Sequence, residues 1–277
     1  MKIAVLTGLA LIAFAFNSIL CRMALGGGEA DAASFTAIRL VSGAVMLAVI
    51  AASIGKTRDA FKRGRWAAAF FLFLYAIAFS FAYAGLTAGT GALILFGSVQ
   101  VTIVAIALFK GMRPTALEWL GLAAAIGGLV YLVFPGIASP PLYASLLMAA
   151  AGFAWGAYTV LGKGSKEPLL NTAGNFILSV PMILTASVPF WPQLQISGRG
   201  WILAILSGAV TSGIGYALWY SVLKHHTPTR TAVMQLSVPV IVAVVGVLML
   251  GETATLRLAI AGFLILGGIA MTVVGKK

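Results

Sequence analysis

Few residues in this chain of 277 could do chemistry, and most of those carry no charge. The only two histidines, His225 and His226, are adjacent, and Cys21 is the only cysteine. Neither a Gly-x-Ser-x-Gly nor a His-Glu-x-x-His motif occurs, and adjacent histidines without further ligands do not make a metal site. We therefore predict no catalytic residue, no metal and no cofactor, which leaves a lipid-handling membrane enzyme as a remote alternative.

The six acidic residues lie near the ends of apolar runs or between them, so none can be nominated for proton coupling. They are Glu29, Asp31, Asp59, Glu118, Glu167 and Glu252. A charge at the centre of a bilayer costs at least about 2.5–3.5 kcal/mol and usually marks an ion or proton pathway. We expect Glu252 at an interface, where it caps the following helix. We expect Arg39 to pair with Glu29 or Asp31, or to extend to the interface, rather than to bind a substrate.

Neutral polar and aromatic side chains remain as candidates for binding a solute. The amides Asn17, Gln100 and Gln235 lie inside apolar runs, where they either hold helices together or line a wet cavity. Trp155 lies between Gly152 and Gly156, which permit a close helix approach. An apolar cavity with a few amides and hydroxyls suits a small neutral or zwitterionic amphipathic solute. The candidate substrate-binding residues are Asn17, Phe79, Ser80, Tyr83, Gln100, Trp155, Tyr158, Tyr216, Trp219, Gln235 and Ser237.

The composition indicates that membrane-spanning helices position these residues. The chain is 61% hydrophobic and only 9% charged, far from the roughly 45–50% apolar and 25% charged of soluble domains. It is therefore predicted to be an all-α integral membrane protein. The net charge of +12 does not indicate nucleic-acid binding, because the Lys and Arg residues stand between apolar runs, where they set topology.

Ten apolar runs are long enough to cross a bilayer, which takes about 20 residues per helix. They are Ile3–Ala24, Ser34–Ile54, Trp66–Leu86, Gly91–Phe109, Leu117–Phe134, Leu142–Leu161, Asn171–Trp191, Trp201–Leu223, Thr231–Leu250 and Leu256–Val274. The first run is too long for a signal peptide and is expected to be retained as a span. The short breaks leave no room for a soluble domain.

The basic residues predict the orientation of the spans. With the N-terminus in the cytoplasm, most of them fall on the cytoplasmic side, and both chain ends are cytoplasmic. These residues are Lys2, Lys56, Arg58, Lys62, Arg63, Arg65, Lys110, Arg113, Lys163, Lys166, Lys224, Arg230, Lys276 and Lys277. Arg22, Arg39, Arg199 and Arg257 are left on or near the other side.

An internal repeat divides the chain into two halves. Met234–Glu252 resembles Phe96–Gly111, with Ser98-Val99 matching Ser237-Val238 at a spacing of 139 positions. We predict a first repeat at 1–138 and a second at 139–277. Since each holds five spans, an odd number, the second enters the membrane from the opposite side, which gives two inverted five-helix repeats around a central cavity. Pro239 interrupts the ninth span and is the predicted hinge, whereas the first half has Gln100 there.

The second half ends Pro239-…-Leu248-Met-Leu-Gly-Glu-Thr253-…-Leu266-Gly-Gly-Ile-Ala270, and with ten spans in two halves it resembles the drug/metabolite transporter superfamily, EamA type. The chain is also similar to the YddG-like exporters of aromatic amino acids. The resemblance implies that spans 1, 3, 4, 6, 8 and 9 surround the cavity, and that the protein exports solutes from the bacterial cytoplasm by alternating access. The first half departs from the pattern, because Lys110-Gly111-Met112-Arg113 stands where a Gly-Glu is expected.

We therefore expect a secondary transporter that exports aromatic or other neutral, apolar amino acids and related metabolites across the bacterial cytoplasmic membrane. An exporter of drug-like or sugar compounds is the alternative, and a non-transporting receptor is disfavoured by the inverted repeat. The expected partners are the lipid bilayer and a small-molecule substrate, with no nucleic acid. The expected assembly is a monomer or weak dimer.

Overall fold

The computed structural model describes residues 2–111, 113–136, 138–223, 225–226 and 228–275. Ten candidate membrane spans are found among them, and all ten predicted runs are confirmed. The first half contains α1 (Lys2–Gly26), α2 (Ala32–Ser53), α4 (Trp66–Tyr83), α5 (Ala88–Phe109) and α6 (Ala116–Val133). The second half contains α7 (Leu142–Gly162), α8 (Pro168–Ser187), α9 (Gly198–Ile205) with its continuation, α11 (Pro228–Gln235) with α12 (Ser237–Leu250), and α13 (Leu256–Val274).

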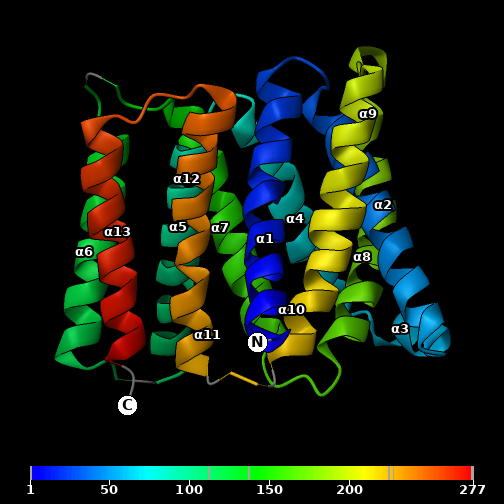
Figure 1. Cartoon of the computed structure of the whole chain (residues 1–277), viewed down its shortest axis with the longest axis horizontal. Helices are drawn as coiled ribbons and strands as arrows, with labels where there is room; N and C mark the ends of the chain where they lie inside the picture. The colour runs from blue at the N-terminus through cyan, green and yellow to red at the C-terminus, as the bar shows by residue number, and fades with distance from the viewer. Residues whose placement is uncertain (1, 112, 137, 224, 227, 276–277) are drawn as a thin grey trace.

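The helices run alternately up and down, so α1 and α7 cross the bundle in opposite directions (Figure 1). The packing repeats this inversion. The contact of α4 with α7 corresponds to that of α1 with the second half's third span, and the contact of α5 with α7 corresponds to that of α1 with α12. Equivalent helices also pair directly, as α2 with α8 and α6 with α13. The fold is thus the expected inverted pair of five-helix units, and the boundary at 138/139 stays a prediction.

Both ends of the chain lie on one face of the bundle, which we call the terminal face; the other is the opposite face (Figure 1). The short helix α3 (Thr57–Arg63) lies at the terminal face and carries three of the basic residues predicted to be cytoplasmic, Arg58, Lys62 and Arg63. Of the basic residues in that prediction, Lys224, Lys276 and Lys277 lie outside the described part of the chain. Met112, in the segment that departs from the family pattern, also lies outside it. At the opposite face a single antiparallel bridge joins Ala30 to Ile196 and so links the two halves.

The eighth and ninth spans depart from regular α-helix. In the eighth, a π-helical segment, η2 (Leu206–Ile214), separates α9 from α10 (Gly215–Leu223). In the ninth, α11 ends at Gln235, one turn before Pro239, because proline has no N–H to donate to that carbonyl and its ring crowds it. By contrast α5 continues without a break through Gln100. The expected asymmetry between the repeats is therefore present, whereas the hinge role of Pro239 stays a prediction.

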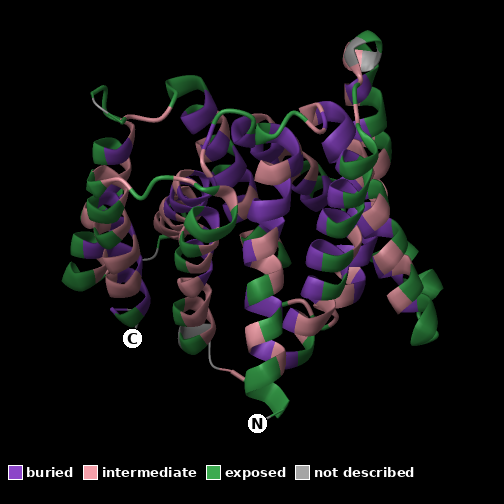
Figure 2. Ribbon diagram, turned by 45° about the horizontal axis from the view of Figure 1, so that its top comes forward, coloured by how far each residue is buried: buried purple, intermediate pink, exposed green. Residues whose placement is uncertain are grey.

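Buried residues concentrate on the inward sides of the helices, and exposed ones on the outward sides (Figure 2). Large apolar side chains such as Leu248 and Phe263 are largely exposed on the outside, as lipid-facing residues are. Among the helix pairs, α6 and α13 approach closely at Gly121 and Gly268. A Cβ added to either glycine would lie 2.5 Å from the carbonyl oxygen of the other. Small residues at such crossings let helices pack in lipid, where no hydrophobic effect drives them together.

This contact predicts a difference between two neighbouring glycines. Gly268→Ala should destabilise the protein by about 1–3 kcal/mol, because the added methyl group forces α6 and α13 apart. Gly267→Ala is the matched control, since a Cβ there meets nothing within 4 Å and alanine favours the helix. Thermal unfolding in detergent should show a lower midpoint for Gly268→Ala only. Equal midpoints for the two variants would contradict the packing described.

Candidate functional site

A small cavity of about 60 Å³ lies inside the bundle, between α1, α2, α4, α5, α7 and the η2–α10 span. We call it the central cavity. Its walls are mainly aromatic, with a few polar groups. The aromatic side chains are Phe14, Tyr75, Phe79, Phe96, Trp155 and Tyr216, and the polar ones are Asn17, Ser18, Arg39, Thr211 and Ser212. It is far smaller than the roughly 300–1,000 Å³ of typical ligand sites and has room for about two waters. It must expand to hold a solute.

Asn17 of α1 joins three elements at this cavity. Its Oδ1 accepts hydrogen bonds from Ser207 Oγ at 2.8 Å and Thr211 Oγ1 at 3.4 Å, both on η2. Its Nδ2 donates to the Tyr75 hydroxyl of α4 at 3.3 Å. Because both ends of the amide already have protein partners, Asn17 positions the cavity wall. Asn17 therefore has both roles expected for buried amides: it holds helices together and it lines a cavity.

Arg39 does not lie where the sequence analysis placed it, at an acidic partner or at the membrane interface. Its side chain is only 3% exposed and points into the central cavity. Nη2 donates to the Tyr75 hydroxyl at 3.1 Å, and the guanidinium carbon lies 4.9 Å from the ring centroid of Phe79 and 5.3 Å from that of Tyr75. Nε and Nη1 have no hydrogen-bond partner among the described residues.

The acids that were expected to pair with Arg39 are engaged elsewhere. Asp31 Oδ1 accepts from the backbone N–H groups of Ala33 and Ser34 and so caps α2, and its Oδ2 accepts from the N–H of Gln195. Glu29 bonds to Ser197 and Arg199 at the opposite face. Arg39 lies two turns below that cap, on the side of α2 that faces the bundle. A pairing with either acid is therefore wrong.

Four stacked rings separate the central cavity from a larger one. Trp155 lies 5.3 Å from Tyr158 and 5.9 Å from Tyr216, and Tyr216 lies 5.9 Å from Tyr220, all between ring centroids. Trp155 and Tyr216 line the central cavity, whereas Tyr158 and Tyr220 line the larger one. The hydroxyl of Thr172 lies 3.2 Å from that of Tyr158 and 3.0 Å from that of Tyr220. We call these four rings the aromatic layer.

The larger cavity has a volume of about 500 Å³ and extends toward the terminal face, so we call it the vestibule. It includes the predicted site residues Tyr158 and Gln235. Its charged residues are all basic: Arg63, Arg65 and Lys163, with His226 beside them. Arg63 Nη2 lies 2.7 Å from Glu167, which also bonds to Lys56. The Lys56 ammonium and the neighbouring Arg63 hold the pKa of the Glu167 carboxyl below its usual value.

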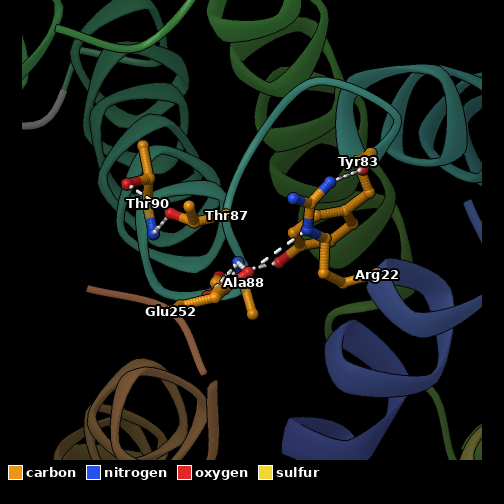
Figure 3. Close-up of polar contacts among 6 residues, drawn as sticks. All are labelled: Arg22, Tyr83, Thr87, Ala88, Thr90 and Glu252. Carbon is orange, nitrogen blue, oxygen red and sulfur yellow. Dashed lines mark hydrogen bonds and ion pairs between the residues drawn. The ribbon is translucent and has the colours of Figure 1, made fainter. Parts of the chain in front are cut away.

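At the opposite face, Glu252 connects the segment after α12 to α1 and to the start of α5 (Figure 3). Its carboxylate accepts from Arg22 Nε at 3.2 Å and from the backbone N–H of Ala88 at 2.8 and 2.9 Å. Arg22 Nη1 also donates to the Tyr83 carbonyl at 3.1 Å. This group, Arg22, Tyr83, Ala88 and Glu252, is the outer closure; a further cavity of about 310 Å³ lies outside it.

The outer closure explains the Leu-Gly-Glu sequence and corrects its expected role. Gly251 ends α12 with φ +64°, a left-handed conformation that suits glycine and turns Glu252 back toward the bundle. Glu252 caps α5, which begins at Ala88, rather than the following helix α13. The hydroxyl of Thr255 caps α13 instead, by accepting from the N–H of Leu258. A carboxylate at the N-terminus of α5 is favoured by the helix dipole.

The structure brings together only part of the predicted site. Asn17, Phe79, Trp155 and Tyr216 line the central cavity, and Tyr158 and Gln235 line the vestibule. The other five predicted residues line neither cavity. They are Ser80, Tyr83, Gln100, Trp219 and Ser237.

Each of those five has another contact. Gln100 Nε2 donates to Thr272 Oγ1 of α13 at 2.6 Å, so it joins helices away from the cavity. Ser80 and Ser237 donate to backbone carbonyls of their own turns. Tyr83 donates to the Ala88 carbonyl, and Trp219 packs edge-on against Phe14.

Sequence reasoning missed Tyr75, Thr211 and Arg39. Tyr75, Phe79 and Tyr83 recur at a spacing of four, which places their rings on one face of a helix and could have identified Tyr75. Nothing in the sequence signals the π-helical turn that presents Thr211. The described part of the chain holds no group of three His, Cys, Asp or Glu side chains suited to a metal ion.

Comparison with known proteins agrees with this architecture. A crystal structure of a protein 18% identical to this chain superposes with a TM-score of 0.67, covering 98% of this chain and 95% of the other, which shows a shared fold. An uncharacterised protein of Pseudomonas aeruginosa is 49% identical over 266 residues, which is 96% of this chain and 92% of that protein. An uncharacterised transporter of Archaeoglobus fulgidus is 28% identical over 214 residues, 70% of each chain. Residues 142–274 match the EamA-like transporter family. The chain belongs to this family of multi-pass membrane transporters.

Proposed function

We propose that the protein exports aromatic or other neutral, apolar amino acids and related metabolites across the bacterial cytoplasmic membrane by alternating access. The observation that carries the proposal is one aromatic cavity with different barriers on its two sides. Toward the terminal face stand the aromatic layer and a vestibule of about 500 Å³, and toward the opposite face stands the outer closure. A site between two barriers, built where inverted repeats meet, is the arrangement that alternating access requires.

The proposal takes the terminal face as cytoplasmic, because the basic residues between the spans gather there. The structure then represents a state whose vestibule faces the cytoplasm. The outer closure blocks release on the far side until the repeats rock past each other. No acidic residue lines either the central cavity or the vestibule in the described part of the chain, so the proposal includes no coupling carboxylate. The protein works as a monomer or weak dimer, since each subunit contains a complete cavity.

Aromatic contacts predict the effect of removing Trp155. In proteoliposomes, wild-type protein should pass labelled tryptophan or methionine down its gradient. Trp155→Ala should lower that flux about tenfold, because the indole stacks on two rings of the aromatic layer and such contacts are worth about 0.5–1.5 kcal/mol each. Phe153→Ala, on the outer side of the same helix, is the control and should keep wild-type flux. Unchanged flux in Trp155→Ala would remove this residue from the site. Passage of sugars or drug-like compounds but neither amino acid would favour the alternative substrate class.

The outer closure predicts the effect of removing Glu252. Glu252→Ala leaves Arg22 and the Ala88 N–H without their acceptor, so the state open to the opposite face should gain population. Ser18 lines the central cavity one turn from Arg22 and can report this as Ser18→Cys in a Cys21→Ala background. Labelling by a membrane-impermeant thiol reagent from the outside should accelerate about tenfold, the equivalent of one charged hydrogen bond. Thr253→Ala, an exposed neighbour, should leave the rate unchanged. If labelling is equally slow with and without Glu252, this contact is not a barrier.

A further inference from the structure

The central cavity contains a positive charge without a counter-charge. Arg39 is 3% exposed, and its Nε and Nη1 have no hydrogen-bond partner in the described part of the chain. No ion pair between described residues involves Arg39. A buried guanidinium without these partners costs free energy. A charged hydrogen-bond acceptor placed against it is therefore bound strongly.

No acidic residue of this protein supplies that acceptor. Glu252 bonds to Arg22, Glu167 to Lys56 and Arg63, and Asp31 to backbone N–H groups. Glu29 pairs with Arg199, and Glu118 caps the helix in which it lies. The remaining acid, Asp59, lies in α3 at the terminal face and lines neither the central cavity nor the vestibule. A negative group at Arg39 therefore has to come from a bound solute.

The vestibule also favours a negatively charged solute. Arg65 and Lys163 line it and form no ion pair with the acidic residues that the structure describes, and none of its described lining residues is acidic. A cleft lined with one sign of charge concentrates solutes of the opposite sign. Anions are thus drawn in from the terminal face toward the aromatic layer, above which Arg39 lies.

We propose that Arg39 binds a carboxylate of the transported solute, so that the site selects aromatic carboxylates whether or not they carry an amino group. The carboxylate bonds to the free nitrogens of Arg39, and the flat apolar part of the solute lies among Phe79, Trp155 and Tyr216. A substrate ammonium finds no carboxylate in the central cavity, only ring faces, so it adds little to selection. This inference rests on the proposed transport function and narrows its substrate class.

The test is equilibrium binding of four related probes to the purified, full-length protein. Tryptophan and indole-3-propionate carry a carboxylate, whereas tryptamine and tryptophanamide do not. Both carboxylates should bind wild-type protein more tightly than either of the other probes. Arg39→Gln should weaken both carboxylates about 30-fold or more, which is the loss expected when a buried charge pair loses one partner. It should leave tryptamine and tryptophanamide unchanged.

Two further variants keep the test decisive. Arg39→Lys preserves the charge and should retain part of the carboxylate preference, which guards against misfolding as the explanation of Arg39→Gln. Arg199→Gln removes an exposed arginine at the opposite face and should bind all four probes like wild-type protein. The inference is overturned if the carboxylates do not bind wild-type protein, if the four probes bind alike, or if Arg39→Gln weakens all of them equally.

Failure of the transport proposal gives a different result. Carboxylate binding that depends on Arg39, in a protein whose proteoliposomes pass none of the four probes, would support the inference and contradict export. Flux of tryptophan and tryptophanamide at equal rates, unaffected by Arg39→Gln, would support export and contradict the inference.

Discussion

A guanidinium group inside a membrane bundle has to be compensated by its neighbours, because a charge at the centre of a bilayer costs at least about 2.5–3.5 kcal/mol. Arg39 is compensated in part, by the rings of Tyr75 and Phe79 and by the Tyr75 hydroxyl, while its Nε and Nη1 have no partner among the described residues. That hydroxyl also accepts from Asn17, whose other end is held by Ser207 and Thr211. One chain of polar contacts thus fixes α1, α2, α4 and η2 around the central cavity. These helices come from both repeats, so a movement between the repeats has to alter the surroundings of Arg39.

The two sides of the cavity are closed by different chemistry. Toward the opposite face, Glu252 bonds to a backbone N–H and an arginine, a directional contact that is either made or broken. Toward the terminal face, the aromatic layer closes the cavity by ring stacking, which tolerates sliding and leaves the hydroxyls of Tyr158 and Tyr220 bonded to Thr172. The broken ninth span places α12, which ends two residues before Glu252, on the far side of a helix interruption. Movement of α12 can therefore change the outer closure without unfolding α11.

Much of the fold could be predicted from the sequence, because span length and charge between spans are local properties. The inversion followed from the odd number of spans in a repeat of 139 positions. The rotation of each helix could not be predicted in this way. Helices such as α5 are apolar all round, so polarity does not say which side faces the cavity. Gln100 was therefore named as a substrate-binding residue, whereas its contact with Thr272 lies between α5 and α13. Glu252 and Arg39 depend on partners distant in sequence, which no local pattern reveals.

The central claim is that the two faces open in turn around the cavity at Arg39. Distances between pairs of spin labels test it most directly, in a Cys21→Ala background. One pair, at Gly27 and Thr253, spans the opposite face, and another, at Lys62 and Lys163, spans the terminal face. We predict that a transported solute shifts the two distance distributions in opposite directions, one widening as the other narrows. Transport with both distributions unchanged, or with both widening together, would contradict alternating closure.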